Sequence, residues 1–82
     1  MTTQKSDVHA YTLVVGLGMT GLSVVRHLHN LGEAVVVADS RDIPPALQEF
    51  RQSYPGIPLH TGKFDNKLFT NAHRIVVSPG DT

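Results

Sequence analysis

Three closely spaced glycines constrain this chain more than any other feature of its sequence. Segment 16–21 reads Gly-Leu-Gly-Met-Thr-Gly, after the apolar run 11–15 and before segment 20–31, where Leu and Val recur at helical spacing. In a strand–turn–helix unit, the first glycine permits a tight turn, the second lets a diphosphate approach the backbone, and the third allows close packing. Amides at the helix start then face an anion. The pattern predicts a nucleotide-binding turn without specifying the nucleotide.

The rest of the chain alternates between strand and helix patterns. The continuous apolar run Ala34–Ala38 is typical of an inner parallel strand, and Asp39 follows it. The further expected elements are a helix from Pro44-Pro45 to about Ser53, a strand at 59–61, a helical turn within 64–71 and a strand at 74–77. Right-handed crossovers then give an α/β, Rossmann-like, doubly wound parallel sheet of about four strands, in the order 3-2-1-4. Segments 16–21 and 78–80 should flank one crevice.

The composition limits the size, the binding partners and the location that we expect for this domain. The chain has 82 residues, enough for one small core, and seven basic residues balance seven acidic ones. No broad electric field would therefore attract nucleic acid or an anionic membrane. Because there is no cysteine and no secretory or membrane-spanning segment, we expect a cytoplasmic location. Residues 1–9 are polar and are expected to form a flexible leader, which leaves 10–82 as the domain.

The sequence contains no visible catalytic machinery. His27 and His29 lie two positions apart on the predicted helix and point in different directions, so we expect no metal site. There is no nucleophile–base pair, no paired carboxylates and no Gly-x-x-x-x-Gly-Lys-Ser/Thr phosphate loop. We therefore expect a binding domain without catalytic residues of its own.

Polar side chains around the predicted crevice allow more than one interpretation. Thr20 can donate to a phosphate oxygen or act as an ordinary helix cap. Asp39 can accept hydrogen bonds from ribose hydroxyls or a base N–H, or cap the turn that follows it. Arg41 can lie against a base, bind the 2′-phosphate of a dinucleotide, or be a solvated surface residue. Segment 78–80, Ser-Pro-Gly, offers a hydroxyl and an unhindered N–H for an anion, or is ordinary loop.

Taken together, these motifs resemble the N-terminal domain of the Mur ligases, and within that family the D-glutamate-adding branch. The matching stretches are Val14–Ser23, Val37–Arg41 with Pro44-Pro45, His60–Gly62 and Ile75–Gly80. The resemblance spans about residues 11–80. Its specificity comes from the combination of the glycine–threonine turn with the later Ser-Pro-Gly, since either motif alone would be unconvincing.

The resemblance implies that the domain holds the UDP part of the cell-wall precursor UDP-MurNAc-L-alanine. By motif, the pyrophosphate would be bound at Gly18, Met19, Thr20, Ser78 and Gly80. The uracil end would be held by Asp39, Ser40 and Arg41.

The resemblance also implies a reaction in the intact family enzyme. ATP phosphorylates the terminal carboxylate of the precursor, the amine of D-glutamate attacks the acyl phosphate, and an amide forms with release of ADP and phosphate. The sites for ATP, magnesium and the amino acid would belong to central and C-terminal domains, so this chain would hold no cofactor. We therefore expect a truncated, inactive chain that lacks the family domain's last strand, with 74–77 as an exposed edge strand.

A second function class remains open at this point. An NAD(H)-binding regulatory domain of the potassium-transport type shares the glycine pattern and the acidic residue at the end of the second strand. The Ser-Pro-Gly segment and the stretch from Asp39 to Pro45 favour the ligase.

Overall fold

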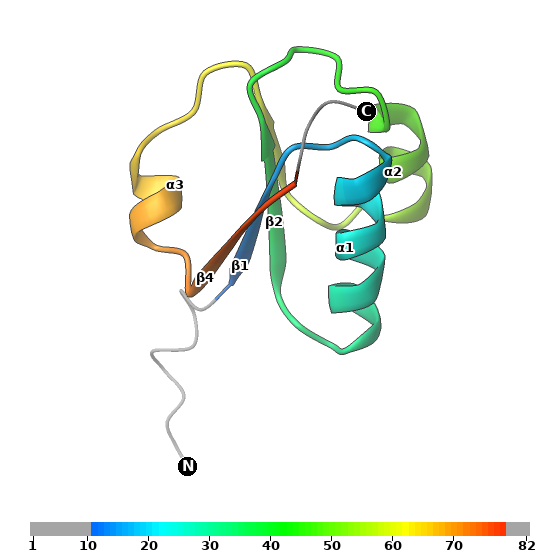
Figure 1. The fold of residues 1–82 in the computed structure, drawn as a ribbon, viewed down its shortest axis with the longest axis horizontal. Coiled ribbons are helices and arrows are strands. Elements are labelled where there is room, and N and C mark those ends of the chain that lie inside the picture. The colour runs from blue at the N-terminus through cyan, green and yellow to red at the C-terminus, as the bar shows by residue number, and fades with distance from the viewer. Residues whose placement is uncertain (1–10, 79–82) are drawn as a thin grey trace.

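The computed structural model describes residues 11–78 as a parallel sheet with helices on both of its faces (Figure 1). Its strands are β1 (Thr12–Val15), β2 (Val35–Asp39), β3 (Leu59–Thr61) and β4 (Arg74–Val77). Its helices are α1 (Met19–Asn30), α2 (Leu47–Ser53) and α3 (Lys67–Thr70). In Figure 1, α1 and α2 lie on one side of the sheet and α3 on the other. The predicted leader 1–9 and residue Gly80 lie outside the described residues.

All strands of the sheet run parallel, in the order β3-β2-β1-β4, which confirms the predicted fold class and strand order. In the register of the sheet, Val15 of β1 is the partner of Ala38 on β2 and of Val77 on β4. The next residues along the three strands are Gly16, Asp39 and Ser78. The sheet therefore brings the start of the glycine turn, the acidic end of β2 and Ser78 to the same edge.

The helix boundaries differ from the predicted ones for identifiable reasons. Helix α1 begins at Met19 rather than Thr20, because Gly18 occupies the N-cap position. Helix α2 begins at Leu47 rather than at the two prolines; the carbonyl of Pro44 accepts a hydrogen bond from Leu47 N–H in a turn ahead of the helix. Short α3 occupies only part of the region expected to be helical.

The main core lies between the sheet and the helices α1 and α2. It consists of Val14, Leu17, Leu22, Val25, Leu28, Val35, Val37, Ala46 and Phe50. Burial of each large apolar side chain contributes about 1.5–3 kcal/mol, so this face carries much of the folding free energy.

The opposite face of the sheet is covered less completely. On β4, Ile75 is 44% and Val77 70% exposed, so this strand is an exposed edge among the described residues, as expected. Helix α3 is attached on this side by the Tyr11 hydroxyl, which donates to the Leu68 carbonyl at 2.7 Å. Within residues 11–78, no helix combines the length and apolar character needed to cross a bilayer.

Candidate functional site

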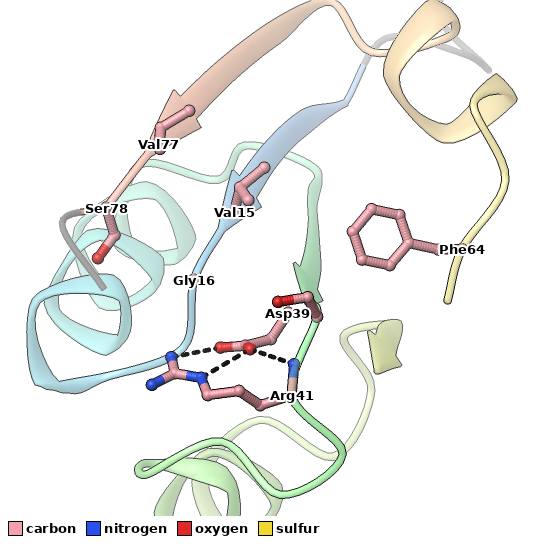
Figure 2. Close-up of a pocket in the computed structure, with 8 residues that line it drawn as sticks. Val15, Gly16, Asp39, Arg41, Phe64, Val77 and Ser78 are labelled. Carbon is pink, nitrogen blue, oxygen red and sulfur yellow. Dashed lines mark hydrogen bonds and ion pairs between the residues drawn. The ribbon is translucent and has the colours of Figure 1, made fainter. Parts of the chain in front are cut away.

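An open pocket of about 310 Å³ lies at the carboxyl ends of β1, β2 and β4 (Figure 2). Its lining residues are Val15, Gly16, Asp39, Ser40, Arg41, Phe64, Val77 and Ser78. Ligands of open α/β sheets bind in this position, outside the carboxyl ends of the strands at the point where the strand order reverses. The pocket is therefore the candidate binding site.

The glycine turn passes directly beside this pocket, and two of its glycines are required by geometry. Gly16 has a φ of +102°, a backbone conformation that residues with a Cβ rarely adopt. A Cβ added at Gly21 would overlap the Gly16 carbonyl, lying 3.0 Å from its carbon and closer still to its oxygen. The first and third glycines thus allow the turn to fold back against the start of α1.

The start of α1 presents backbone amides next to the turn. Gly18 is the N-cap, in an extended conformation, and no side chain caps this end of the helix. The amide of Leu22 donates to the carbonyl of Gly18 at 2.9 Å. In an α-helix, the amides ahead of this bond have no intrahelical acceptor. Thr20 is not the helix cap, and both Met19 and Thr20 are exposed at the first turn.

Ser78 lies directly against the glycine turn. Its backbone N–H donates to the carbonyl of Val15 at 2.9 Å, which continues the pairing of β4 with β1. The residue is only 6% exposed, and within residues 11–78 its Oγ has no hydrogen-bond partner. This Oγ would lie 3.6 Å from a Cβ added at either Gly16 or Gly21. A buried hydroxyl without a partner therefore sits against the turn.

Asp39 connects the end of β2 to the glycine turn. Its Oδ2 accepts a hydrogen bond from the backbone N–H of Leu17 at 2.7 Å, and its Oδ1 accepts one from the backbone N–H of Arg41 at 2.8 Å. The Arg41 guanidinium adds a bidentate pair, at 2.9 Å from Nε and 2.7 Å from Nη2, which Figure 2 shows as dashed lines. The Arg41 side chain lowers the pKa of Asp39 from 3.8 to about 2, helped by both backbone amides and opposed by burial.

The structure assembles part of the predicted site in one pocket. Asp39, Ser40, Arg41 and Ser78 all line it, whereas Gly18, Met19 and Thr20 lie beside it at the start of α1. Gly80 is outside the described residues. Among residues 11–78, no three His, Asp or Glu side chains come close enough to hold a metal ion.

The apolar walls of this pocket were not among the residues predicted from the sequence. Val15 and Val77 end the paired strands β1 and β4, and Phe64 follows β3, with its ring facing Asp39 and Val15 across the pocket in Figure 2. The signal that could have identified them is positional. All three residues lie at or just beyond the carboxyl end of a strand, where ligands of this fold bind.

Comparison with known proteins agrees with this geometry. Residues 10–81 match the family described as Mur ligase MurD-like, N-terminal domain. A relative from Marinobacter nauticus, named UDP-N-acetylmuramoylalanine–D-glutamate ligase, is 51% identical over 69 residues, which cover 84% of this chain and 16% of the relative. Relatives of the same name from Methylococcus capsulatus and Methylobacillus flagellatus are 46% identical over 74 residues and 50% identical over 68 residues.

These matches distinguish the two function classes that remained open. They cover 83–90% of this chain but only 15–16% of each of the three relatives. The relatives are ligases, and the matching family is defined by a ligase domain, so the NAD(H)-binding alternative is not favoured. The chain belongs to the MurD-like Mur ligases and corresponds to their N-terminal domain.

Proposed function

We propose that this domain holds the UDP part of UDP-MurNAc-L-alanine while other domains of an ATP-dependent ligase attach D-glutamate to the precursor. The names of the relatives support the substrate class, and the pocket at the carboxyl ends of the strands supports a nucleotide. ATP, magnesium and D-glutamate would be held by central and C-terminal domains. The 82 residues by themselves, in the cytoplasm or in the test tube, would bind precursor without turning over ATP.

The start of α1 would bind the pyrophosphate. The amides of Met19 and Thr20 precede the first intrahelical hydrogen bond, and no side chain caps this end of the helix. Aligned peptide dipoles give the helix N-terminus a partial positive charge, which favours an anion there. No acidic residue lies in the first turn to oppose a phosphate.

The observation that carries this proposal is the buried hydroxyl of Ser78, which has no hydrogen-bond partner among residues 11–78. Leaving a buried donor unpaired costs about 1–3 kcal/mol, so such groups are uncommon in folded proteins unless a ligand satisfies them. The hydroxyl lies against Gly16 and Gly21, next to the amides at the start of α1. A phosphate oxygen bound at those amides would be a suitable acceptor for it.

The pocket beside the turn would take the uridine. Val15, Phe64 and Val77 provide apolar surface for the base, and Ser40 and Arg41 provide polar groups for its edges and for the ribose. A volume of about 310 Å³ is at the lower end for ligand sites, which commonly measure ~300–1,000 Å³. This volume suits the uracil base and its ribose, and it leaves the MurNAc sugar and the L-alanine of the precursor outside the pocket.

Amide NMR titrations of the 82-residue chain test this proposal. We expect UDP and UDP-MurNAc-L-alanine to shift the amide signals of residues 18–21, and NAD and NADP to leave them unchanged. The Ser78→Ala variant should bind UDP about tenfold more weakly, since a hydrogen bond to a charged group is lost. The same variant should be as stable as the wild type or more stable, because it removes a buried hydroxyl that no group within residues 11–78 pairs with. Ser53→Ala, at the far end of α2, is the matched control and should change neither property.

Three results would contradict the proposal. Shifts at residues 18–21 with NAD but not with UDP would favour the regulatory domain instead. Unchanged UDP affinity in Ser78→Ala would show that the hydroxyl does not contact the nucleotide. Steady turnover of ATP by the 82-residue chain would contradict the expectation that the chemistry resides in other domains.

A further inference from the structure

The carboxylate of Asp39 is completely occupied by groups of the protein itself. An ionised carboxylate offers about four lone-pair positions, two on each oxygen. Here Oδ1 accepts from Arg41 N–H and Nε, and Oδ2 accepts from Leu17 N–H and Arg41 Nη2, all at 2.7–2.9 Å. The residue is only 2% exposed. A ligand hydroxyl or base N–H could bond to Asp39 only by displacing one of these donors.

Through its hydrogen bond with Leu17, this carboxylate holds the glycine turn in position. Leu17 lies in the glycine turn, between Gly16 and Gly18. Its N–H is held by Asp39, and its carbonyl accepts a hydrogen bond from Ala46 N–H at 3.1 Å. The peptide group on one side of Leu17 is therefore anchored to the last residue of β2, and the peptide group on the other side to the segment that follows β2. Since Gly18 is the N-cap of α1, this anchor determines where the amides at the helix start are directed.

We infer that Asp39 is a positioning residue that holds the glycine turn in place through Leu17 and makes no contact with the nucleotide. This inference rests on the proposed function, and it departs from the direct contact that the sequence pattern suggested. Polar contacts at this end of the pocket then come from Ser40 and from Arg41, whose side chain is 39% exposed.

The same arrangement makes the pocket selective among nucleotides. In dinucleotide-binding domains, the acidic residue at the end of the second strand accepts hydrogen bonds from a ribose diol. In this chain the fork of Arg41 occupies both carboxylate oxygens in a side-on pair at 2.7 and 2.9 Å, a strong geometry. The ribose diol of NAD would find no open acceptor at Asp39. The pair thus excludes the usual recognition of NAD while keeping the phosphate-binding turn.

Comparison of two probes, inorganic pyrophosphate and uridine, tests the inference in the Asp39→Asn variant. If Asp39 acts through the turn, the variant binds pyrophosphate and UDP more weakly by the same factor, about tenfold, and binds uridine as the wild type does. The amide signal of Leu17 should also move in the ligand-free variant. Asp42→Asn is the matched control, because Asp42 is exposed and does not line the pocket. It should leave both affinities within twofold of the wild type.

The outcomes separate this inference from the proposed function. Weaker binding of uridine and UDP with unchanged binding of pyrophosphate would overturn the inference and make Asp39 a ligand of the nucleoside. Failure of the wild type to bind UDP would overturn the proposed function, and the ligand-free Leu17 signal would then decide whether Asp39 holds the turn. A measurement on the wild type covers the case in which Asp39→Asn does not fold. The carboxyl carbon signal of Asp39 should stay unchanged on saturation with UDP, and a large shift would overturn the inference.

Discussion

Replacement of Gly21 by alanine tests the close contact between α1 and the glycine turn. The local and the tertiary effects of this substitution should change the free energy of unfolding in opposite directions. Gly21 is the third residue of α1, and alanine is favoured over glycine inside a helix by about 1 kcal/mol. Helix propensity alone would therefore make Gly21→Ala more stable than the wild type. The tertiary structure opposes this gain, since the new Cβ would overlap the backbone of Gly16.

The size of the net effect follows from that overlap. The Cβ would lie 3.0 Å from the carbonyl carbon of Gly16, with the oxygen closer, whereas ordinary contact begins near 3.4 Å. Overpacking typically costs about 1–3 kcal/mol, and the upper end applies here because backbone rather than a flexible side chain must move. After subtraction of the propensity gain, we expect a loss of about 2 kcal/mol in the free energy of unfolding. A domain of this size has only about 4–12 kcal/mol in total.

Urea denaturation followed by far-UV circular dichroism measures this loss. Gly56→Ala is the matched control, because nothing lies within 4 Å of a Cβ added there and its φ is not positive. It should be neutral or stabilising by up to about 1 kcal/mol. If Gly21→Ala proved as stable as Gly56→Ala, the close contact between α1 and the turn would be wrong. The explanation of the third glycine would fail with it.

Three further predictions concern the acidic pH range and the edges of the sheet. Because the pKa of Asp39 is lowered from 3.8 to about 2, its contribution of roughly 2 kcal/mol is present above pH 4 and is lost as the pH falls to 2. Acid titration of stability should therefore be flatter in Asp39→Asn, and equal slopes would contradict this. Tyr11→Phe removes the hydrogen bond to the Leu68 carbonyl and should cost about 1 kcal/mol, with faster hydrogen exchange in α3. Arg74→Gln should cost under ~1 kcal/mol, measured by urea denaturation, because its bridge to Glu33 is half exposed; a larger loss would show a stronger network.

Much of the architecture could be predicted from local patterns. Continuous apolar runs identified the inner strands, right-handed crossovers predicted a parallel sheet, and the structure confirms the expected strand order 3-2-1-4. The first residues of α1 and α2 were less predictable, because each helix start depends on the conformation of the backbone just before it. Gly18 rather than Thr20 caps α1, and the prolines precede α2 instead of beginning it.

The candidate site was predictable in its location but only partly in its contacts. The glycine turn, Asp39 and Ser78 were expected to share one crevice, and the sheet register brings them to one edge because parallel strands end together. Phe64 was not predicted, because it is an apolar residue in the loop after β3 and belongs to no sequence motif of a binding site.

The sequence by itself determined the strand–turn–helix unit, the parallel sheet and the family resemblance, since these depend on the spacing of residues along the chain. Only the tertiary structure decided what the polar atoms do. It gave all four acceptor positions of Asp39 to Leu17 and Arg41, and it left the buried hydroxyl of Ser78 beside the turn without a partner in the described part of the chain. Hydrogen bonds are directional and act over about 3 Å, so their partners follow from coordinates that no spacing of residue types specifies.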